Sequence, residues 1–201
     1  MCYNEPRASY KNEKPMPADN LLRGARVRLA ALTSDDLPTI AGWYHDAAFG
    51  RMFDARPAAP RAASALEGWL DEYARSNSGF LFAVRALADD ALLGFVELEG
   101  VLWVHQHAWV SIAIGDPAHQ GQGYGREALA LALRFAFQEL NLHRVQLTVF
   151  SYNARAIALY ERLGFVREGV YREHLQRDGV RHDMYLYGLL RREWLATQSP
   201  P

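Results

Sequence analysis

The chain has 201 residues, of which 50% are hydrophobic and 22% are charged, and this composition is typical of one soluble globular domain. A formal net charge of -1 gives no overall field that favours nucleic acid or an anionic membrane as a partner. The single cysteine, Cys2, excludes an intramolecular disulfide and a multi-cysteine zinc site, so we expect a cytoplasmic protein without a metal centre.

The two ends of the chain differ in composition from the segment between them. Residues 1–20 combine Pro6, Pro15 and Pro17 with scattered charge and no periodicity, which predicts a disordered leader. No apolar run approaches the roughly 20 residues that a membrane helix needs, so we expect no membrane partner. The sequence therefore predicts a single domain over residues 21–195 and a C-terminal tail over residues 196–201.

The first half of this domain predicts strands and helices in a regular order. Val27 and Leu29 alternate with arginines as in a short strand, and residues 33–36 offer N-caps for a helix that ends near His45. A loop with several aromatic residues and prolines then precedes a helix near residues 62–76. Residues 80–86, 92–99 and 108–114 predict three consecutive strands.

The second half begins with a glycine-rich loop. Apolar residues at helical spacing follow it and predict a helix over residues 124–140. A strand over residues 145–149, a helix over residues 154–163 and a hairpin of strands 166–175 and 181–190 complete the pattern. Because a strand, a helix and a strand follow one another between residues 108 and 149, we expect one parallel crossover in an otherwise antiparallel sheet.

The glycine-rich loop offers a site for an anion. Gly121, Gly123 and Gly125 leave the backbone uncovered where a helix starts, so several N–H groups can point at one phosphate. A dinucleotide fingerprint would need glycine or alanine in place of Arg126, and the lysine of a nucleotide-hydrolysing loop is absent. A flexible turn without a ligand is an equally good interpretation of the glycines alone.

A second motif separates these alternatives. Gln120, Gly123 and Gly125 form a Gln-x-x-Gly-x-Gly pattern that resembles the pyrophosphate-binding motif of the GNAT superfamily of N-acetyltransferases. Residues 153–165 resemble the second signature of the same superfamily, and the likeness extends over about residues 22–194. Residues 112–115 and 181–184 resemble the branch of ribosomal-protein N-terminal and spermidine acetyltransferases.

This resemblance implies a fold and a donor. The expected fold is α/β, with a seven-stranded, mostly antiparallel mixed sheet that splays between its fourth and fifth strands and is flanked by about four helices. The expected donor is acetyl-CoA, held by the backbone of the fourth strand, by the glycine loop and by the following helices. The residues that the resemblance assigns to the coenzyme are Ile112, Ala113, Ile114, Gln120, Gly121, Gln122, Gly123, Tyr124, Gly125, Arg126, Asn153, Ala156 and Tyr160. Arg126 is also compatible with a solvated helix turn, and Asn153 with a simple N-cap.

The catalytic groups follow from the resemblance only in part. Tyr160 matches the family tyrosine that acts as general acid toward the coenzyme sulfur. The glutamates that relatives use as general base are replaced by Thr148 and Trp109. Candidates for the base are Glu97 and Glu99 on the third strand, the pair His105 and His107, or a chain of water molecules. A solvated strand face is the favoured interpretation of the two glutamates.

The acceptor site is expected between the first two helices. Trp43, Tyr44, Phe49 and Phe53 form an aromatic cluster in this region, although any one of them is also compatible with an ordinary core position. The cleft sequence has no excess of acidic residues, so a polyamine is not favoured over a peptide N-terminus or another small amine. We expect an acetyl-CoA-dependent N-acetyltransferase that transfers the acetyl group directly in a ternary complex, as a monomer or a homodimer. A coenzyme-A-binding module without catalysis and an interaction protein are the alternatives.

Overall fold

The computed structural model describes residues 21–198, which form six α-helices and a seven-stranded sheet. In chain order the elements are β1 (Val27–Ala31), α1 (Leu37–Trp43), α2 (Ala47–Phe53), α3 (Ser64–Arg75), β2 (Phe80–Ala86), β3 (Leu92–Leu102), β4 (His107–Ile114), α4 (Tyr124–Arg134), β5 (Arg144–Phe150), α5 (Ala154–Arg162), β6 (Val166–Arg177), β7 (Val180–Leu190) and α6 (Arg191–Gln198). The predicted leader over residues 1–20 lies outside the described residues. No helix in the described part is long and apolar enough to cross a membrane.

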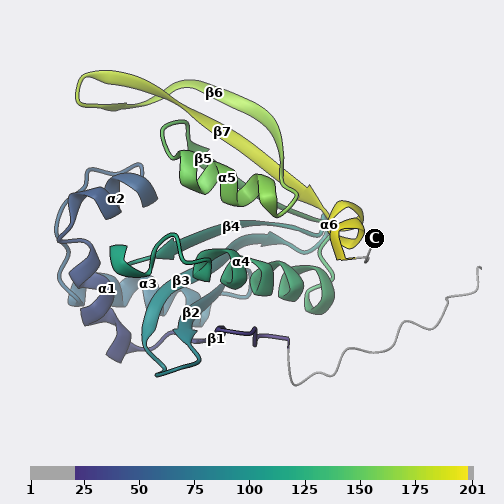
Figure 1. Ribbon diagram of the computed structural model, residues 1–201, viewed down its shortest axis with the longest axis horizontal. Coiled ribbons are helices and arrows are strands. Elements are labelled where there is room, and N and C mark those ends of the chain that lie inside the picture. The colour runs from purple at the N-terminus through teal and green to yellow at the C-terminus, as the bar shows by residue number, and fades with distance from the viewer. Residues whose placement is uncertain (1–20, 199–201) are drawn as a thin grey trace, which may run out of the picture.

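The sheet confirms the predicted topology (Figure 1). Its strand order is β1-β2-β3-β4-β5-β7-β6, and β4 with β5 is its parallel pair. This pairing covers three residue pairs, from His107 with Arg144 to Trp109 with Gln146. β4 nevertheless continues to pair with β3 as far as Ile114. The edge of β4 that faces β5 is therefore open over its last residues, and the sheet splays there as expected.

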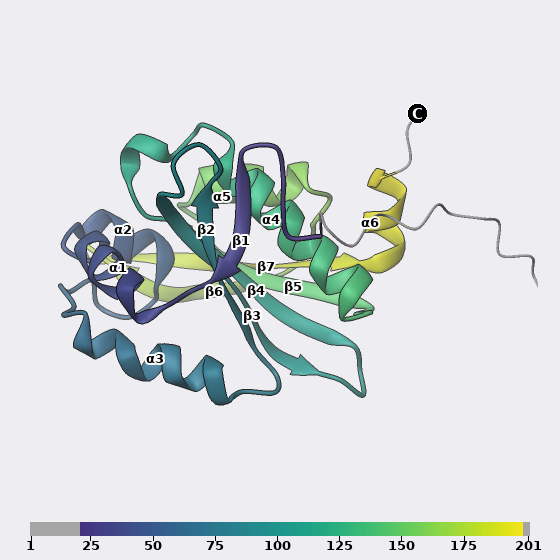
Figure 2. The same ribbon diagram turned by 90° about the horizontal axis from the view of Figure 1, so that it is seen from below.

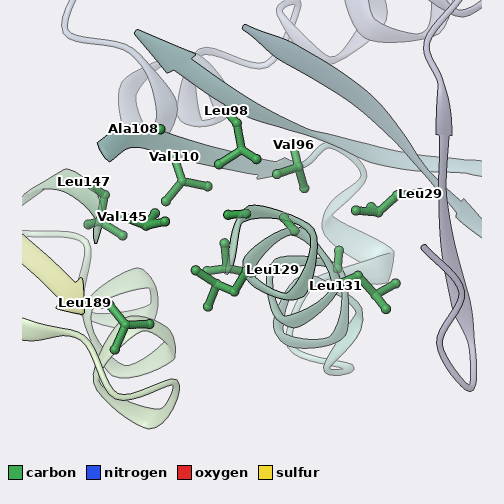
Figure 3. Packing of buried hydrophobic residues seen from close by; sticks show 14 of the residues in the cluster. Leu29, Val96, Leu98, Ala108, Val110, Leu129, Leu131, Val145, Leu147 and Leu189 are labelled. Atoms are coloured by element: carbon green, nitrogen blue, oxygen red, sulfur yellow. The ribbon is translucent and has the colours of Figure 1, made fainter. Parts of the chain in front are cut away.

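Helices cover both faces of the sheet (Figure 2). On one face, α4 packs against the strands, and Figure 3 shows Val96 and Leu98 of β3 directed toward Leu129 of this helix. On the other face, α1, α2 and α3 enclose a second buried cluster that contains Ile40 and Phe95. Because successive side chains of a strand alternate between faces, Glu97 and Glu99 share the face of Phe95 and point to the side of α1–α3.

Three helices depart from the sequence prediction. α2 occupies part of the predicted aromatic loop, and its N-cap is the side chain of Asp46, which accepts a hydrogen bond of 2.8 Å from the amide of Ala48. α6 follows β7 directly and runs to Gln198, so it includes residues that the prediction places in a C-terminal tail. The helix expected over residues 124–140 is α-helical as far as Arg134 and ends in a π-helical turn over Phe135–Glu139.

Candidate active site

A cavity of about 880 Å³ lies at the splay between β4 and β5. Its walls come from α2, α3 and α5 and from strands β3, β4 and β5. The lining residues used below are Tyr44, Met52, Phe53, Asp54, Ala55, Arg56, Arg61, Trp69, Glu72, Tyr73, Glu97, Glu99, Trp109, Ser111, Ile112, Thr148, Asn153, Ala156 and Tyr160. The cavity thus brings together one predicted motif, both candidate glutamates and a helix that the prediction leaves out of the site.

The glycine loop before α4 has the backbone shape of an anion site. Gly121 and Gly123 have φ angles of +75° and +88°, a region that side-chain-bearing residues rarely adopt, and Gly123 is the N-cap of α4. Gly125 packs against β4, since a Cβ atom there would lie 3.4 Å from Cγ1 of Ile114. The loop therefore joins β4 tightly to the N-terminus of a helix of eleven residues, where free amides and the helix dipole favour a phosphate.

Arg26, the residue before β1, holds this loop from its carbonyl side. Its Nη1 donates to the carbonyl of Gln122 at 2.8 Å, and its guanidinium lies 5.1 Å from the ring centroid of Tyr124. Glu127 accepts a hydrogen bond of 2.7 Å from the amide of Arg26. Burial raises the pKa of Glu127, but the hydrogen bonds from Arg26 and Val27 outweigh it and bring the pKa below its usual value. Arg126, by contrast, is exposed on the first turn of α4.

The open edge of β4 offers backbone groups to an extended ligand. The amide of Gly115 donates to the carbonyl of Leu93 on β3 at 2.9 Å. Because backbone groups of alternate residues point to opposite sides, those of Ile112 and Ile114 face the splay, whereas those of Ala113 face β3. The side chain of Gln120 donates to the carbonyl of Ile114 at 2.8 Å and so joins the glycine loop to this edge.

The second motif lies at the start of α5 and along its inner face. Oδ1 of Asn153 accepts from the amide of Ala156 at 3.2 Å, which is an N-cap, while its Nδ2 donates to the carbonyl of Met52 at 3.3 Å. Tyr160 is 7% exposed, and its hydroxyl makes no hydrogen bond within residues 21–198. Burial raises the pKa of Tyr160 to about 12. Its phenol is therefore protonated at neutral pH and free to donate into the cavity.

Glu97 is a buried carboxylate on the wall of this cavity, with 9% of its surface exposed. One of its oxygens accepts from Nε1 of Trp69 at 2.7 Å, and the other accepts from Oγ of Ser111 at 2.5 Å. Both donors are neutral, and no arginine or histidine among residues 21–198 forms an ion pair with Glu97. Glu97 therefore does not lie on a solvated strand face, because α3 covers the sheet at this residue, whereas Glu99 on the same face is exposed.

Glu99 on β3 and Glu72 on α3 extend the acidic wall of the cavity, and Tyr73 of α3 lies beside them. Partial burial raises the pKa of Glu99, and the neighbouring charges of Glu97 and Glu72 raise it further, against a hydrogen bond with Tyr73 that lowers it. The pKa of Tyr73 is raised well above its usual value by burial and by the same carboxylates. The cavity therefore carries three glutamates, an acidity that the sequence analysis did not expect.

The other charged residues of the cavity largely pair with each other. Asp54 lies 2.7 Å from Arg56 and 3.1 Å from Arg61. Burial alone raises the pKa of Asp54, but the hydrogen bonds from Arg56 outweigh it and lower the pKa below its usual value. Asp54 and the two arginines together carry a formal charge of +1, so the cavity lining with its three glutamates keeps a formal excess of two negative charges.

Several predicted site residues lie elsewhere. Trp43 and Phe49 belong to the second core cluster, outside the cavity lining, whereas Tyr44 and Phe53 line the cavity. Trp43 fills the space beside Gly115, where a Cβ atom would collide with its ring. Their placement gives no support to an acceptor contact for Trp43 or Phe49.

The two histidines that were candidates for the base also lie outside the cavity. The rings of His105 and His107 stack with their centroids 6.3 Å apart at the β3–β4 turn. Within residues 21–198, no three side chains of histidine, cysteine, aspartate or glutamate are grouped to hold a metal ion. Of the candidate bases, only Glu97 and Glu99 reach the cavity.

Sequence reasoning missed the contribution of α3. Trp69, Glu72, Tyr73 and Ser76 all line the cavity. Their spacing of three, one and three residues places them on one helical face, and this face carries polar as well as aromatic side chains. That mixed stripe was the signal available in the sequence, since a helix that only packs on a core shows an apolar one.

Comparisons with known proteins agree on the family. A family model described as an acetyltransferase (GNAT) domain matches residues 26–166. The spermidine N(1)-acetyltransferase of Vibrio cholerae is 35% identical over 130 residues, which are 65% of this chain and 74% of that protein. The ribosomal protein uS5 alanine N-acetyltransferase of Escherichia coli is 29% identical over 136 residues, which are 67% of this chain and 70% of that protein.

A solved structure resembles the whole domain. The crystal structure of spermidine N-acetyltransferase from Vibrio cholerae in complex with CoA and spermine matches with a TM-score of 0.77 and 30% sequence identity, over 84% of this chain and 98% of that one. The glycine loop, the open edge of β4 and the splayed cavity fit a coenzyme with a pyrophosphate and an extended arm. This chain belongs to the GNAT acetyltransferase family and is an N-acetyltransferase that takes its acetyl group from acetyl-CoA.

Proposed function

We propose that this N-acetyltransferase acts on a primary amine of a small acceptor that carries more than one positive charge. The observation that carries the proposal is the row of Glu72, Glu97 and Glu99 along the cavity, which forms no ion pair within residues 21–198 and outweighs the net positive charge of Asp54, Arg56 and Arg61. A cationic group that enters this cavity gains from the excess negative charge, whereas a neutral or anionic acceptor does not. The relatives named for spermidine acetylation support the same class of acceptor.

The donor half of the cavity is assigned to acetyl-CoA, which supplies a reactive thioester. We assign the pyrophosphate to the amides of the loop from Gly121 to Gly125 and the extended arm to the backbone of Ile112 and Ile114. Asn153 and Ala156 border the same space at the start of α5. Arg126 is exposed and stays a prediction as a contact to the coenzyme.

Direct transfer requires that one proton leaves the amine and that another reaches the departing sulfur. Glu99 is our candidate for the first step, because its raised pKa makes it a better proton acceptor than an ordinary glutamate. The amine nitrogen then bonds to the acetyl carbon while the bond from that carbon to sulfur breaks. Tyr160 donates a proton to the sulfur, and Glu97, held by Trp69 and Ser111, binds the cationic acceptor.

A panel of matched amines tests this proposal. Release of free thiol from acetyl-CoA is measured with 1,4-diaminobutane, butylamine, spermidine and a peptide with an N-terminal alanine. Loss of the second charge should lower kcat/KM by about 10- to 100-fold from diaminobutane to butylamine, since a charged hydrogen bond contributes about 1.5–3 kcal/mol. Equal values for these two amines would contradict the acidic acceptor site. Binding of coenzyme A without turnover of any amine would favour the alternative of a binding module.

We also expect that the enzyme works in the cytoplasm as a monomer or a homodimer, as the sequence predicts. These two expectations do not affect the chemistry proposed above. The acceptor panel uses the purified full chain and is independent of both.

A further inference from the structure

The segment Arg51–Arg56, which we call the strap, lies where the two halves of the splayed sheet face each other. It comprises the end of α2 and the residues after it, and Met52, Phe53, Asp54, Ala55 and Arg56 all line the cavity. Figure 1 shows α2 at the open end of the splay, near the tip of the β6–β7 hairpin. The strap is therefore a wall of the cavity that belongs to the half of the molecule built from β1–β4.

Backbone carbonyls of the strap accept hydrogen bonds from the other half. The hydroxyl of Tyr152 donates to the carbonyl of Arg51 at 2.6 Å. Nη2 of Arg177, at the end of β6, donates to the carbonyls of Asp54, Ala55 and Arg56 at 2.9, 3.3 and 3.0 Å. Asp178 of the same hairpin forms an ion pair with the side chain of Arg51.

The contact made by Arg177 differs from an ordinary surface interaction. Arg177 is half-buried, and its Nε is buried without a hydrogen-bond partner within residues 21–198, so this atom has given up water to reach the strap. By comparison, Asp178 has a side chain that is 78% exposed, and an exposed ion pair contributes little. Because β4 and β5 are joined by only three residue pairs, the distance between the halves at this end depends on the contacts of the strap, which are made by Arg177 together with Tyr152, Asn153 and Asp178.

We propose that Arg177 is a positioning residue for the acceptor, which it serves by fixing the strap as the outer wall of the acceptor site. Arg177 does not line the cavity itself and acts only through the strap. This role of Arg177 rests on the proposed function, because that proposal places the amine, and not the coenzyme, next to the strap. The geometry predicts that loss of Arg177 weakens amine binding and leaves coenzyme binding intact, because the glycine loop and the open edge of β4 lie on other elements.

The test compares Arg177→Ala with Arg172→Ala, a control on the exposed surface of the same strand. For Arg177→Ala we expect KM for spermidine to rise at least about tenfold, the equivalent of one charged hydrogen bond, with KM for acetyl-CoA and kcat within about twofold. The control should match the unmodified enzyme. Arg177→Lys keeps the charge but not the fork of donors, so an intermediate KM is expected. Equal rises in the two KM values, or no rise in either, would overturn the role of Arg177.

Hydrogen–deuterium exchange provides a second readout that does not depend on turnover. The amide of Asp54 donates to the carbonyl of Gly50 at 2.8 Å, and release of the strap exposes it to solvent. Exchange over residues 47–57 should accelerate in Arg177→Ala and stay unchanged over α4. Unchanged exchange in the strap refutes the positioning role.

If no amine of the panel is acetylated, the proposed function fails, and the exchange experiment still decides whether Arg177 holds the strap. If Arg177→Ala does not fold, both readouts are applied to Arg177→Lys.

Discussion

Replacement of Gly123 by alanine tests the assignment of the glycine loop most sharply. At φ +88° an alanine meets the steric cost of the left-handed region, about 1–2 kcal/mol, and its Cβ would lie 2.9 Å from Nη2 of Arg26. The loop relieves this strain if the backbone at residue 123 rotates to a negative φ, which turns the amides away from the anion. Recovery of the binding conformation then costs about 1–2 kcal/mol, so the Kd for coenzyme A should rise about 5- to 30-fold.

Isothermal titration calorimetry with coenzyme A measures this change, and Gly68→Ala is the matched control. Gly68 lies inside α3, and a Cβ atom there would have no atom within 4 Å. The control should leave the Kd unchanged and stabilise the fold by about 0.5–1 kcal/mol, because alanine is the better helix former. A folded Gly123→Ala protein that binds coenzyme A as tightly as the control would refute the loop as the pyrophosphate site.

Two further substitutions test the proposed proton transfers. Tyr160→Phe should lower kcat by at least about 100-fold with an unchanged KM for acetyl-CoA. Because its hydroxyl makes no hydrogen bond within residues 21–198, the thermal midpoint should also stay unchanged, and undiminished turnover would exclude Tyr160 as the acid. Glu99→Gln should slow turnover at pH values above the folded pKa of Glu99, where the carboxylate of the unmodified enzyme is ionised and can accept a proton. The folded pKa of Glu99 lies above its ordinary value of 4.5, so its ionised form disfavours folding as the pH rises through that folded pKa. Glu99→Gln should therefore raise the thermal midpoint at pH 8 and not at pH 4, and a lowered midpoint at pH 8 would contradict the assigned cause.

Much of the fold was predictable because long elements carry their own pattern. β4 and β5 alternate or concentrate β-branched and apolar residues, and α4 repeats leucine and alanine at helical spacing, so their bounds agree with the prediction within a few residues. The seven residues of α2 are too few to show a helical period between nearby prolines, and α6 follows β7 without a break in composition. Their helical structure depends on packing, which sequence periodicity does not report.

The glycine loop could be recognised from the sequence, whereas the acidic wall of the cavity could not. The loop is local in sequence, since Gln120 to Gly125 form a single turn before α4, and its contact with the coenzyme stays a prediction. The acceptor wall joins Glu97 on β3 to Trp69 on α3, two residues that meet only because the sheet face is covered by that helix. The sequence therefore favoured a solvated strand face for Glu97, and only the tertiary structure reveals its buried hydrogen bonds. The contacts of Arg177 could not be predicted from the sequence either, because the carbonyl groups that it contacts lie more than 120 residues away in the chain.

A crystal structure of the chain with coenzyme A and 1,4-diaminobutane tests the central claim most directly. We predict that the pyrophosphate lies on the amides from Gly121 to Gly125, that the extended arm lies along Ile112 and Ile114, and that the amine lies within hydrogen-bond distance of Glu97 or Glu99. Coenzyme A bound away from the splay, or an amine bound with no glutamate as its neighbour, would contradict the account.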